Sequence, residues 1–324
     1  MIETQRYPSR EEWLQARASR DEPRVGSSEI ATLLGFGYAS ESPYTLWSKK
    51  TGRATAPWND DDLRRLEAGQ AGESYARRMF ELETKMPAYA DDGWTIRLNR
   101  DFPAFAASLD AWTDGPRGAL RPVELKIVGR HQIWEYEQDE LPEKFTLQVQ
   151  HQIAVTGADV GYLCAVCGTD VIVRDIPRHD RLIRAMHAVA EKFLRSVVDD
   201  TPPEIDGSEA TAKAIAAQFP DVDPDTVRVI DSPDFERLAA RRDRLKAAEA
   251  NVKDLLFQID SRIKQAMGSH EYAVLPGDAL FSWKKSARGR VLRRHPRVSR
   301  AIRKAVEQKR QQPRAGETSH ARAI

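Results

Sequence analysis

Three residues of types that can hydrolyse phosphodiester bonds lie close together in two short apolar segments. Asp110 ends the sequence Ser-Leu-Asp at 108–110, and Glu124 and Lys126 lie in Val-Glu-Leu-Lys at 123–126. Aspartate and glutamate supply the hard oxygen ligands that Mg²⁺ prefers. On a strand, Glu124 and Lys126 project to the same face, because side chains repeat every second residue. There the lysine could position a water or neutralise charge on a phosphate.

The same pattern has an ordinary structural interpretation. In a chain with 31% charged residues, an aspartate followed by Glu-x-Lys arises by chance, and a solvated hairpin with one ion pair would contain the same residues. The glycines and proline at 114–118 predict a turn between two strands. The three residues alone leave both a magnesium-dependent nuclease site and a surface hairpin open.

One amphipathic helix, or two short ones, is predicted before these strands, over about 62–83, from apolar residues at three- and four-residue spacing. It contains Gly69 and Gly72, each of which costs about 1 kcal/mol in a helix interior relative to alanine. Their presence predicts a close approach of the backbone to a neighbour. Glu73 follows as a second acidic candidate, or as the partner of Arg77 in an ordinary ion pair.

A second helix is predicted after the strands, over 144–156, and Gly157 ends it. Gln148 and Gln152 lie one turn apart on the same face, beside an apolar stripe. Such amides usually cap or bridge backbone groups, but they can also hold a water or a phosphate.

The order of these segments resembles the YqaJ-like viral recombinase family, which includes the phage lambda-type exonuclease among the restriction-endonuclease-like PD-(D/E)xK nucleases. The resemblance covers about residues 10–175. It rests on an ordered set of blocks at 13–17, 24–31, 43–52, 69–73, 108–110, 123–126 and 148–157. The family usually has Ser-Pro-Asp-Gly where this chain has Ser-Leu-Asp-Ala at 108–111. Leu109 removes the backbone constraint of a proline, which we expect the geometry to tolerate.

The resemblance implies metal and catalytic roles for the acidic residues and the lysine. Asp110 and Glu124 would be the principal metal ligands, helped by the backbone carbonyl of Leu125. Lys126 would be the catalytic lysine, and Glu73 would lie near the metal. Replacing Asp110, Glu124 or Lys126 is then expected to abolish cleavage and to leave folding nearly intact.

The resemblance implies three further site residues. Gln148 matches the glutamine of the helix that packs over the site. Arg17 and Ser28 match positions that hold the 5′-terminal phosphate of the digested strand. For Ser28, capping the N-terminus of a helix is an equally ordinary role.

The implied fold is α/β, with a restriction-endonuclease-like core in which a mixed central sheet is flanked by helices. The implied activity is 5′-to-3′ digestion of linear double-stranded DNA ends for phage-type recombination, with Mg²⁺ as cofactor and Mn²⁺ as its alternative. The implied partners are DNA ends, a single-strand annealing recombinase and further copies of the chain in a ring-shaped trimer. A structure- or single-strand-specific endonuclease of the same fold and a non-catalytic DNA-binding scaffold stay open as alternatives.

Composition excludes several other classes of protein. No apolar run approaches the roughly 18 residues of a membrane span, and the N-terminus lacks a secretory signal. We therefore expect a soluble protein with no membrane partner, and the resemblance implies a phage or prophage protein in the cytoplasm of a bacterial host. Cys164 and Cys167 are too few for a four-cysteine cluster and are predicted to be two buried thiols on paired strands.

Three regions are expected along the 324 residues. The nuclease domain covers 1–205 and a Pro-containing linker closes it. A helical appendage at 206–283 contains a long amphipathic helix over 235–267, whose apolar stripe favours docking or oligomerisation, and a hairpin. A basic tail covers 284–324, with 14 Lys/Arg against 2 Asp/Glu in a chain of net charge +1. The tail is either a phosphate contact or a solvated extension.

Overall fold

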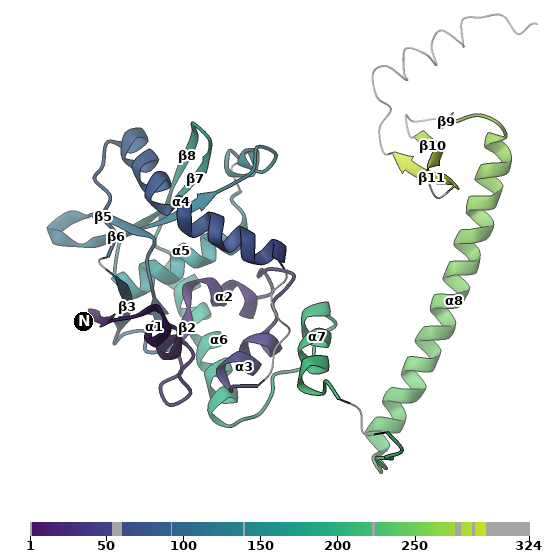
Figure 1. Ribbon diagram of the computed structural model, residues 1–324, viewed down its shortest axis with the longest axis horizontal. Coiled ribbons are helices and arrows are strands. Elements are labelled where there is room, and N and C mark those ends of the chain that lie inside the picture. Colours follow the sequence, from purple (N-terminus) through teal and green to yellow (C-terminus); the bar gives the residue numbers. More distant parts are fainter. Residues whose placement is uncertain are drawn as a thin grey trace, which may run out of the picture. The chain divides into compact units, whose positions relative to one another are not determined.

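The computed structural model describes residues 2–53, 60–91, 93–138, 140–221, 224–275, 280–286 and 289–295. The chain divides into two compact units, Met1–Pro224 and Asp225–Ile324. The first unit combines helices with two four-stranded sheets, each containing parallel and antiparallel pairs (Figure 1). The predicted mixed α/β fold is therefore confirmed, and all candidate site residues lie in this unit.

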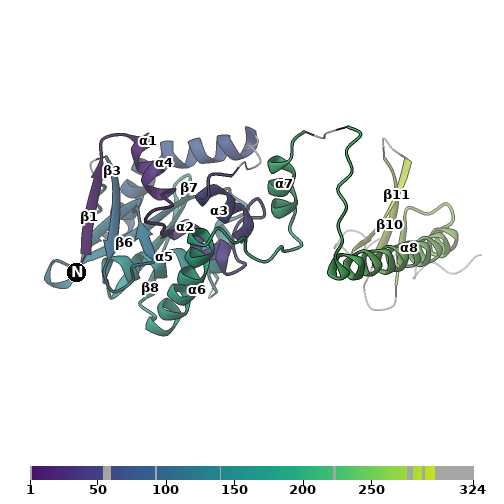
Figure 2. The same cartoon turned by 90° about the horizontal axis from the view of Figure 1, so that it is seen from below.

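One sheet of the first unit has the strand order β1-β3-β4-β2. Its strands are β1 (Ile2–Tyr7), β2 (Val25–Gly26), β3 (Trp94–Asn99) and β4 (Phe105–Ala107). Strand β1 forms an edge and pairs antiparallel with β3 (Figure 2), whereas β2 and β4 are parallel. After β4 the chain passes through residues 108–110 into the other sheet, so the expected single central sheet is divided into two.

The second sheet carries the predicted Glu-x-Lys strand. Its order is β5-β6-β7-β8, with strands β5 (Ala111–Asp114), β6 (Leu120–Ile127), β7 (Val160–Cys167) and β8 (Asp170–Pro177). The short helix η1 (Pro116–Gly118) makes the predicted turn between β5 and β6. Strands β6 and β7 are parallel, and a parallel pair needs a crossover. The crossover includes η2 (Ile133–Tyr136) and α5 (Glu143–Thr156).

Two helices cover the second sheet. Helix α4 (Asp60–Thr84) contacts β6, β7 and β8, and α5 contacts β6 and β7 (Figure 1). A Cβ on Gly72 would overlap the Cδ1 atom of Ile127, which confirms the close approach predicted there, whereas nothing lies near Gly69. Helix α5 ends where Gly157 adopts a φ of +68°, a left-handed conformation that glycine accommodates without a steric cost.

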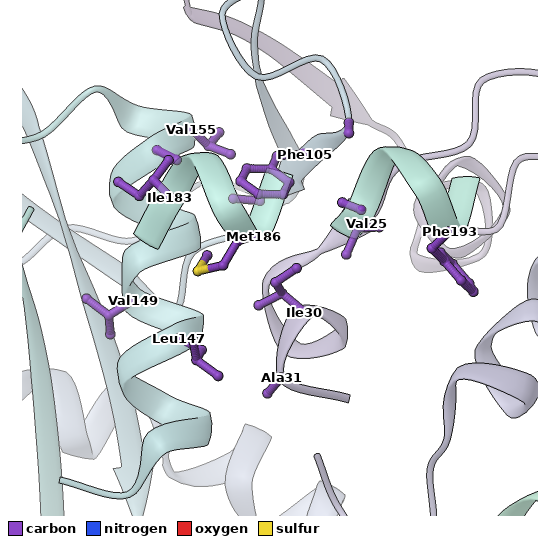
Figure 3. Close-up of a cluster of buried hydrophobic side chains, with 14 of the residues drawn as sticks. Val25, Ile30, Ala31, Phe105, Leu147, Val149, Val155, Ile183, Met186 and Phe193 are labelled. Atoms are coloured by element: carbon purple, nitrogen blue, oxygen red, sulfur yellow. The ribbon is translucent and has the colours of Figure 1, made fainter. Parts of the chain in front are cut away.

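The larger hydrophobic core lies where α5 meets α2 (Ser27–Leu33) and α6 (Asp180–Val198). Figure 3 shows Ile30, Val149, Ile183 and Met186 of this cluster, together with Phe105 from β4. This packing fixes the position of α5, so the polar side chains on its other faces are held in place as well.

The two cysteines differ in their environment. Cys164 is fully buried, and burial, with a smaller contribution from Glu83, raises the pKa of its thiol to about 12. Cys167 is only partly buried and precedes the turn at Gly168. Both are free thiols, so the prediction of two buried thiols holds for Cys164 and is wrong for Cys167.

Helix α7 (Glu209–Gln218) belongs to the first unit. It packs on α3 (Pro43–Lys50), where the Thr211 hydroxyl donates to Ser42 Oγ at 2.8 Å and the Gln218 amide donates to Ser48 Oγ at 3.1 Å. The structure therefore moves the domain boundary from near 205 to 224. The prolines that predicted a linker are followed by a helix that packs on the first unit. The sequence did not reveal this packing, because the serine residues that α7 contacts lie far from it in the sequence.

The second unit begins with the predicted long helix, α8 (Pro233–Met267). Its apolar side chains Leu238, Leu245, Val252 and Leu256 are each more than half exposed, and a docking or oligomeric role for this face stays a prediction. A three-stranded antiparallel sheet follows, made of β9 (Tyr272–Val274), β10 (Leu280–Ser286) and β11 (Gly289–His295). No described helix is long and apolar enough to span a membrane.

The expected basic tail is corrected at its start. Residues 284–286 and 289–295 lie in β10 and β11, where Trp283 pairs with Leu292 and Ser282 Oγ contacts His295 Nε2 at 2.8 Å. Residues 290–295 do not alternate between polar and apolar side chains, so the sequence pattern did not indicate this strand. The predicted turn at 276–278 and the rest of the tail, 296–324, lie outside the described residues.

Candidate active site

Strand β6 turns Glu124 and Lys126 to one face and Val123 and Leu125 to the other. Val123 and Leu125 join the core cluster that faces α4. On the opposite face, the Lys126 ammonium donates to Glu124 Oε1. The Glu124 side chain is 0% exposed and that of Lys126 is 23% exposed. The predicted common face of Glu124 and Lys126 is therefore confirmed.

Asp110 is held against the same strand from the neighbouring segment. Its Oδ2 atom accepts a hydrogen bond from the backbone N–H of Leu125 at 3.0 Å. Just before it, the Ser108 hydroxyl donates to the Thr95 carbonyl at 2.7 Å and accepts from Trp13 Nε1 at 3.0 Å. Leu109 packs against the larger core. These contacts fix the segment without the proline that the resemblance would place at 109.

Burial and neighbouring carboxylates raise the pKa of Asp110 and of Glu73. Burial raises the pKa of Asp110 far above its usual range, and the Glu124 carboxylate raises it further, although Lys126 acts in the opposite direction. Burial also raises the pKa of Glu73. The charge of Lys126 lowers this pKa, and the charge of Glu124 raises it. These couplings place the three carboxyl groups in one electrostatic cluster. The ion pair of Glu73 with Arg77 is absent from the described contacts.

Lys126 is the cation of this cluster. Burial acts to lower the pKa of its ammonium group, but the carboxylates of Glu124 and Asp110 outweigh burial and raise it above its ordinary value. Removing Lys126 would leave Glu124 buried without a cation, which is strongly destabilising. We therefore expect replacement of Lys126 to lower the free energy of unfolding, in contrast to the first expectation that folding would stay nearly intact.

A cleft of about 610 Å³ brings the other predicted residues to this cluster. It is lined by residues from four regions of the chain, among them Arg17, Ser28, Glu73, Asp110 and Gln148. Glu124 and Lys126 are not among the lining residues, but both interact electrostatically with Asp110, which is one of them. The cleft thus brings five of the predicted site residues together, and Asp110 connects it with Glu124 and Lys126.

The phosphate-binding part of the prediction needs one correction. Ser28 is the second residue of α2, whose N-cap is Gly26, so the N-cap interpretation of Ser28 is wrong and its side chain is exposed. Arg17 ends α1 (Arg10–Arg17) and its guanidinium lies 4.6 Å from the Trp13 ring centroid. Arg17 and Ser28 both line the cleft, so both side chains can contact a ligand there.

Glu29 lines this cleft and Lys50 pairs with it, and the sequence predicted neither as a site residue. The Glu29 carboxylate accepts from the Gly26 N–H at 2.8 Å and pairs with the Lys50 ammonium at 3.0 Å. Burial acts to raise the pKa of Glu29, but Lys50 and Arg17 outweigh it and lower the pKa. Glu29 therefore stays ionised and fixes the start of α2, while Lys50 offsets its negative charge beside Arg17.

Gln152 is a site residue whose role sequence reasoning missed. Its side-chain N–H donates to Glu124 Oε2 at 2.6 Å, and the residue is 1% exposed. Its Oε1 atom is buried without a hydrogen-bond partner among the described residues. The shared face of Gln148 and Gln152 was the available signal, but only the structure shows which of the two amides reaches the glutamate.

We expect Gln152→Leu to lower the free energy of unfolding by about 1.5–3 kcal/mol, the range for a hydrogen bond to a charged group, and to reduce DNA cleavage. The matched control is Gln150→Leu on the same helix. Gln150 is also buried but bonds the neutral backbone of Pro177 and His179, at 2.6 and 2.9 Å. Urea denaturation and cleavage assays should show lost stability for both variants and lost activity for Gln152→Leu alone. Equal activity of the two variants would contradict a role for Gln152 in the site.

The oxygen atoms around Asp110 and Glu124 are of the type that a divalent cation binds. No three His, Cys, Asp or Glu side chains in the described parts of the chain are arranged to hold a metal ion. Asp110 and Glu124 nevertheless offer two hard oxygen donors, and the backbone carbonyl of Leu125 lies between Glu124 and Lys126 in sequence. Burial and the neighbouring Glu124 carboxylate raise the pKa of Asp110, and a bound cation would favour the charged form of such a carboxyl group. These residues therefore fit such an ion, with Glu73 beside it.

Solved structures and a curated relative are similar to this chain. An alkaline exonuclease (LHK-Exo) from Laribacter hongkongensis aligns with a TM-score of 0.43 and 19% identity, over 59% of this chain and 94% of that one. The complex of LHK-Exo with dAMP aligns over the same shares with a TM-score of 0.46 and 20% identity. Uncharacterized protein YqaJ of Bacillus subtilis (strain 168) is 23% identical over 290 residues, which are 87% of this chain and 86% of the relative.

The comparison with protein families finds one matching domain. Residues 12–159, a little under half of the chain, match the YqaJ-like viral recombinase domain. This range contains every residue of the cluster around Asp110 and the whole of α5, which lies over it. The part of the chain that holds the candidate site is therefore similar to the YqaJ-like viral recombinase domain.

Proposed function

We propose that the chain is a metal-dependent exonuclease that digests linear double-stranded DNA from its 5′ ends and leaves 3′ single strands for recombination. The observation that carries the proposal is the arrangement of Asp110, in the segment just before β5, against Glu124 and Lys126 of β6, beside a cleft that also contains Arg17 and Ser28. A recombinase-family domain agrees with DNA as the substrate. The order of α4, β5, β6, α5 and β7 supports a restriction-endonuclease-like core.

Each residue of the site would have a separate task in hydrolysis. Asp110, Glu124 and the Leu125 carbonyl would hold Mg²⁺ or Mn²⁺, with Glu73 nearby. The bound ion would lower the pKa of a water and stabilise charge on the phosphate. Lys126 stays protonated because its pKa is raised, so it would donate hydrogen bonds and positive charge to the phosphate or the water and would not accept a proton. Gln148 would contact the substrate from the wall of the cleft.

Arg17 and Ser28 would determine which DNA end is accepted. A guanidinium group binds a phosphate with several donors in a fixed geometry. We expect Arg17→Ala to slow digestion of 5′-phosphorylated ends by about 10- to 100-fold, which corresponds to one lost charged hydrogen bond, and to affect 5′-hydroxyl ends much less. Arg20→Ala is the control, because Arg20 is exposed and pairs with Asp200 at 3.5 Å. Equal slowing on both kinds of end would contradict the pocket.

The function itself is tested with three DNA substrates and purified protein. A linear 5′-phosphorylated duplex should be digested progressively with Mg²⁺ and should be untouched in EDTA, while covalently closed circles should resist. Cleavage of closed circles would instead indicate an endonuclease, and cleavage restricted to nicks or single strands would indicate the structure-specific alternative. A folded protein that binds DNA and cuts none of these substrates would support the scaffold hypothesis. From the same resemblance, we also propose an annealing recombinase as the partner and a ring-shaped trimer as the assembly.

A further inference from the structure

Helix α5 carries three polar side chains, one turn apart, along the face that meets the site. They are Lys144, Gln148 and Gln152, and residues at i and i+4 lie on the same face of a helix. Gln152 is buried and bonds Glu124, and Gln148 lines the cleft. Lys144, at the first turn of α5, is the third member of this row and has no place in the proposed chemistry.

Lys144 lies between two aromatic rings and close to Lys126. Its Nζ atom is 4.4 Å from the ring centroid of Tyr38 and 4.7 Å from that of Phe145. Lys126 Nζ lies 5.1 Å from the same Phe145 centroid. Tyr136 stacks on Phe145 with a centroid distance of 5.9 Å and fixes that ring. Two ammonium groups are thus held beside one buried phenyl group.

The charge of Lys144 is not neutralised by an ion pair with any described carboxylate. Burial lowers the pKa of its ammonium group; Glu135 acts in the opposite direction, and Lys126 lowers the pKa further. A half-buried cation next to a second cation is stabilised by an anion that contacts both. A backbone phosphate next to the one that Lys126 would contact supplies such an anion.

Tyr38 adds a stacking surface to this charge. It belongs to the connection between α2 and α3, and it is 51% exposed although Lys144 lies over its ring. Aromatic side chains beside a basic groove bind unpaired bases by stacking. Bases inside a duplex have both faces covered by their neighbours, so only an unpaired nucleotide can use the exposed ring.

We propose that Lys144 and Tyr38 form a subsite for one unpaired nucleotide of DNA, in which Lys144 binds its phosphate and Tyr38 stacks on its base. The proposal rests on the proposed function, because it assigns the subsite to the substrate of that site. It places an unpaired nucleotide next to Lys126.

The test is equilibrium binding of a short fluorescein-labelled oligothymidylate to the full chain in EDTA, where no cleavage consumes the probe. Tyr38→Ala should weaken binding by about 5- to 150-fold, the range for one base–aromatic contact, and Tyr38→Phe should bind like the wild type. Lys144→Ala should reduce the slope of log affinity against log salt concentration by about 0.7, the value for one phosphate of a single strand, and Lys144→Arg should restore it. A blunt duplex should respond to Lys144→Ala and not to Tyr38→Ala.

Exposed residues of the same types serve as controls. Tyr75 is 46% exposed and its hydroxyl donates to the Gly168 carbonyl, and Lys192 is exposed on α6. Tyr75→Ala and Lys192→Ala should leave oligonucleotide binding unchanged. Wild-type affinity of folded Tyr38→Ala and Lys144→Ala would overturn the subsite while leaving the nuclease proposal to its own cleavage test. Equal loss on duplex and single strand for Tyr38→Ala would overturn the stacking assignment, and a wild type that binds no oligonucleotide would overturn the subsite as a whole.

Discussion

Lys126→Ala is expected to slow DNA cleavage by at least about 100-fold, the cost of removing one positioned donor from a transition state. The same change should also destabilise the protein by about 3–5 kcal/mol, since it leaves the fully buried Glu124 carboxylate without its cation. A loss of activity in this variant alone therefore does not separate a catalytic lysine from a structural one. Urea denaturation has to accompany the cleavage assay.

Lys126→Arg separates the two roles. Arginine keeps the positive charge beside Glu124, so most of the stability should return, but its guanidinium group is larger, planar and less able to take the place of a compact ammonium group. We expect a folded protein with strongly reduced cleavage. Lys192→Ala on the exposed face of α6 is the control and should retain both properties. Full activity of Lys126→Arg would show that only charge is needed at this position.

The predicted elements around the site follow from local sequence patterns. The alternation of Val123, Glu124, Leu125 and Lys126 fixed which side chains share a face, because a buried strand has a period of two. Gly157 ends α5 in the structure as it was predicted to do. Both predictions depend only on residues close together in the sequence, where geometry is set by the backbone itself.

Contacts between distant segments were not predictable in the same way. Gln152 reaches Glu124 across 28 positions, and Lys50 reaches the backbone carbonyl of Arg17 across 33. The amphipathic pattern of α5 placed Gln148 and Gln152 on one face without indicating which strand that face meets. Tyr38 illustrates the same limit, since nothing in the connection between α2 and α3 points to Lys144. Packing of the whole unit decides these pairs.

Asp110→Asn is expected to reduce cleavage by at least about 1,000-fold, because a neutral amide replaces a carboxylate ligand whose ion supplies several kcal/mol of transition-state stabilisation. The side-chain oxygen of asparagine can still accept the hydrogen bond from Leu125 N–H that Asp110 accepts at 3.0 Å. The fold around β5 and β6 should therefore persist. Cleavage of the linear duplex under Mg²⁺ measures the loss, and Asp175→Asn, at an exposed position of β8, is the control.

The same variant should be more stable than the wild type in EDTA. Burial and Glu124 raise the pKa of Asp110 in the folded state above its unfolded value. Between these two pKa values, the unfolded chain has released a proton that the folded chain still holds, so wild-type stability falls as the pH rises from about 4 towards the raised value.

The asparagine side chain of the Asp110→Asn variant carries no such proton. The stability gain of the variant should therefore be small near pH 4 and should reach about 1 kcal/mol or more at neutral pH, since each unit of pKa difference is worth about 1.4 kcal/mol. Urea denaturation across this pH range measures the gain. A variant that is less stable than the wild type at neutral pH would contradict the clustering of carboxyl groups on which the site depends. Carboxyl groups that lower the stability of the fold in this way are typical of functional sites. A surface hairpin with one ion pair would not bury a second carboxylate beside the first.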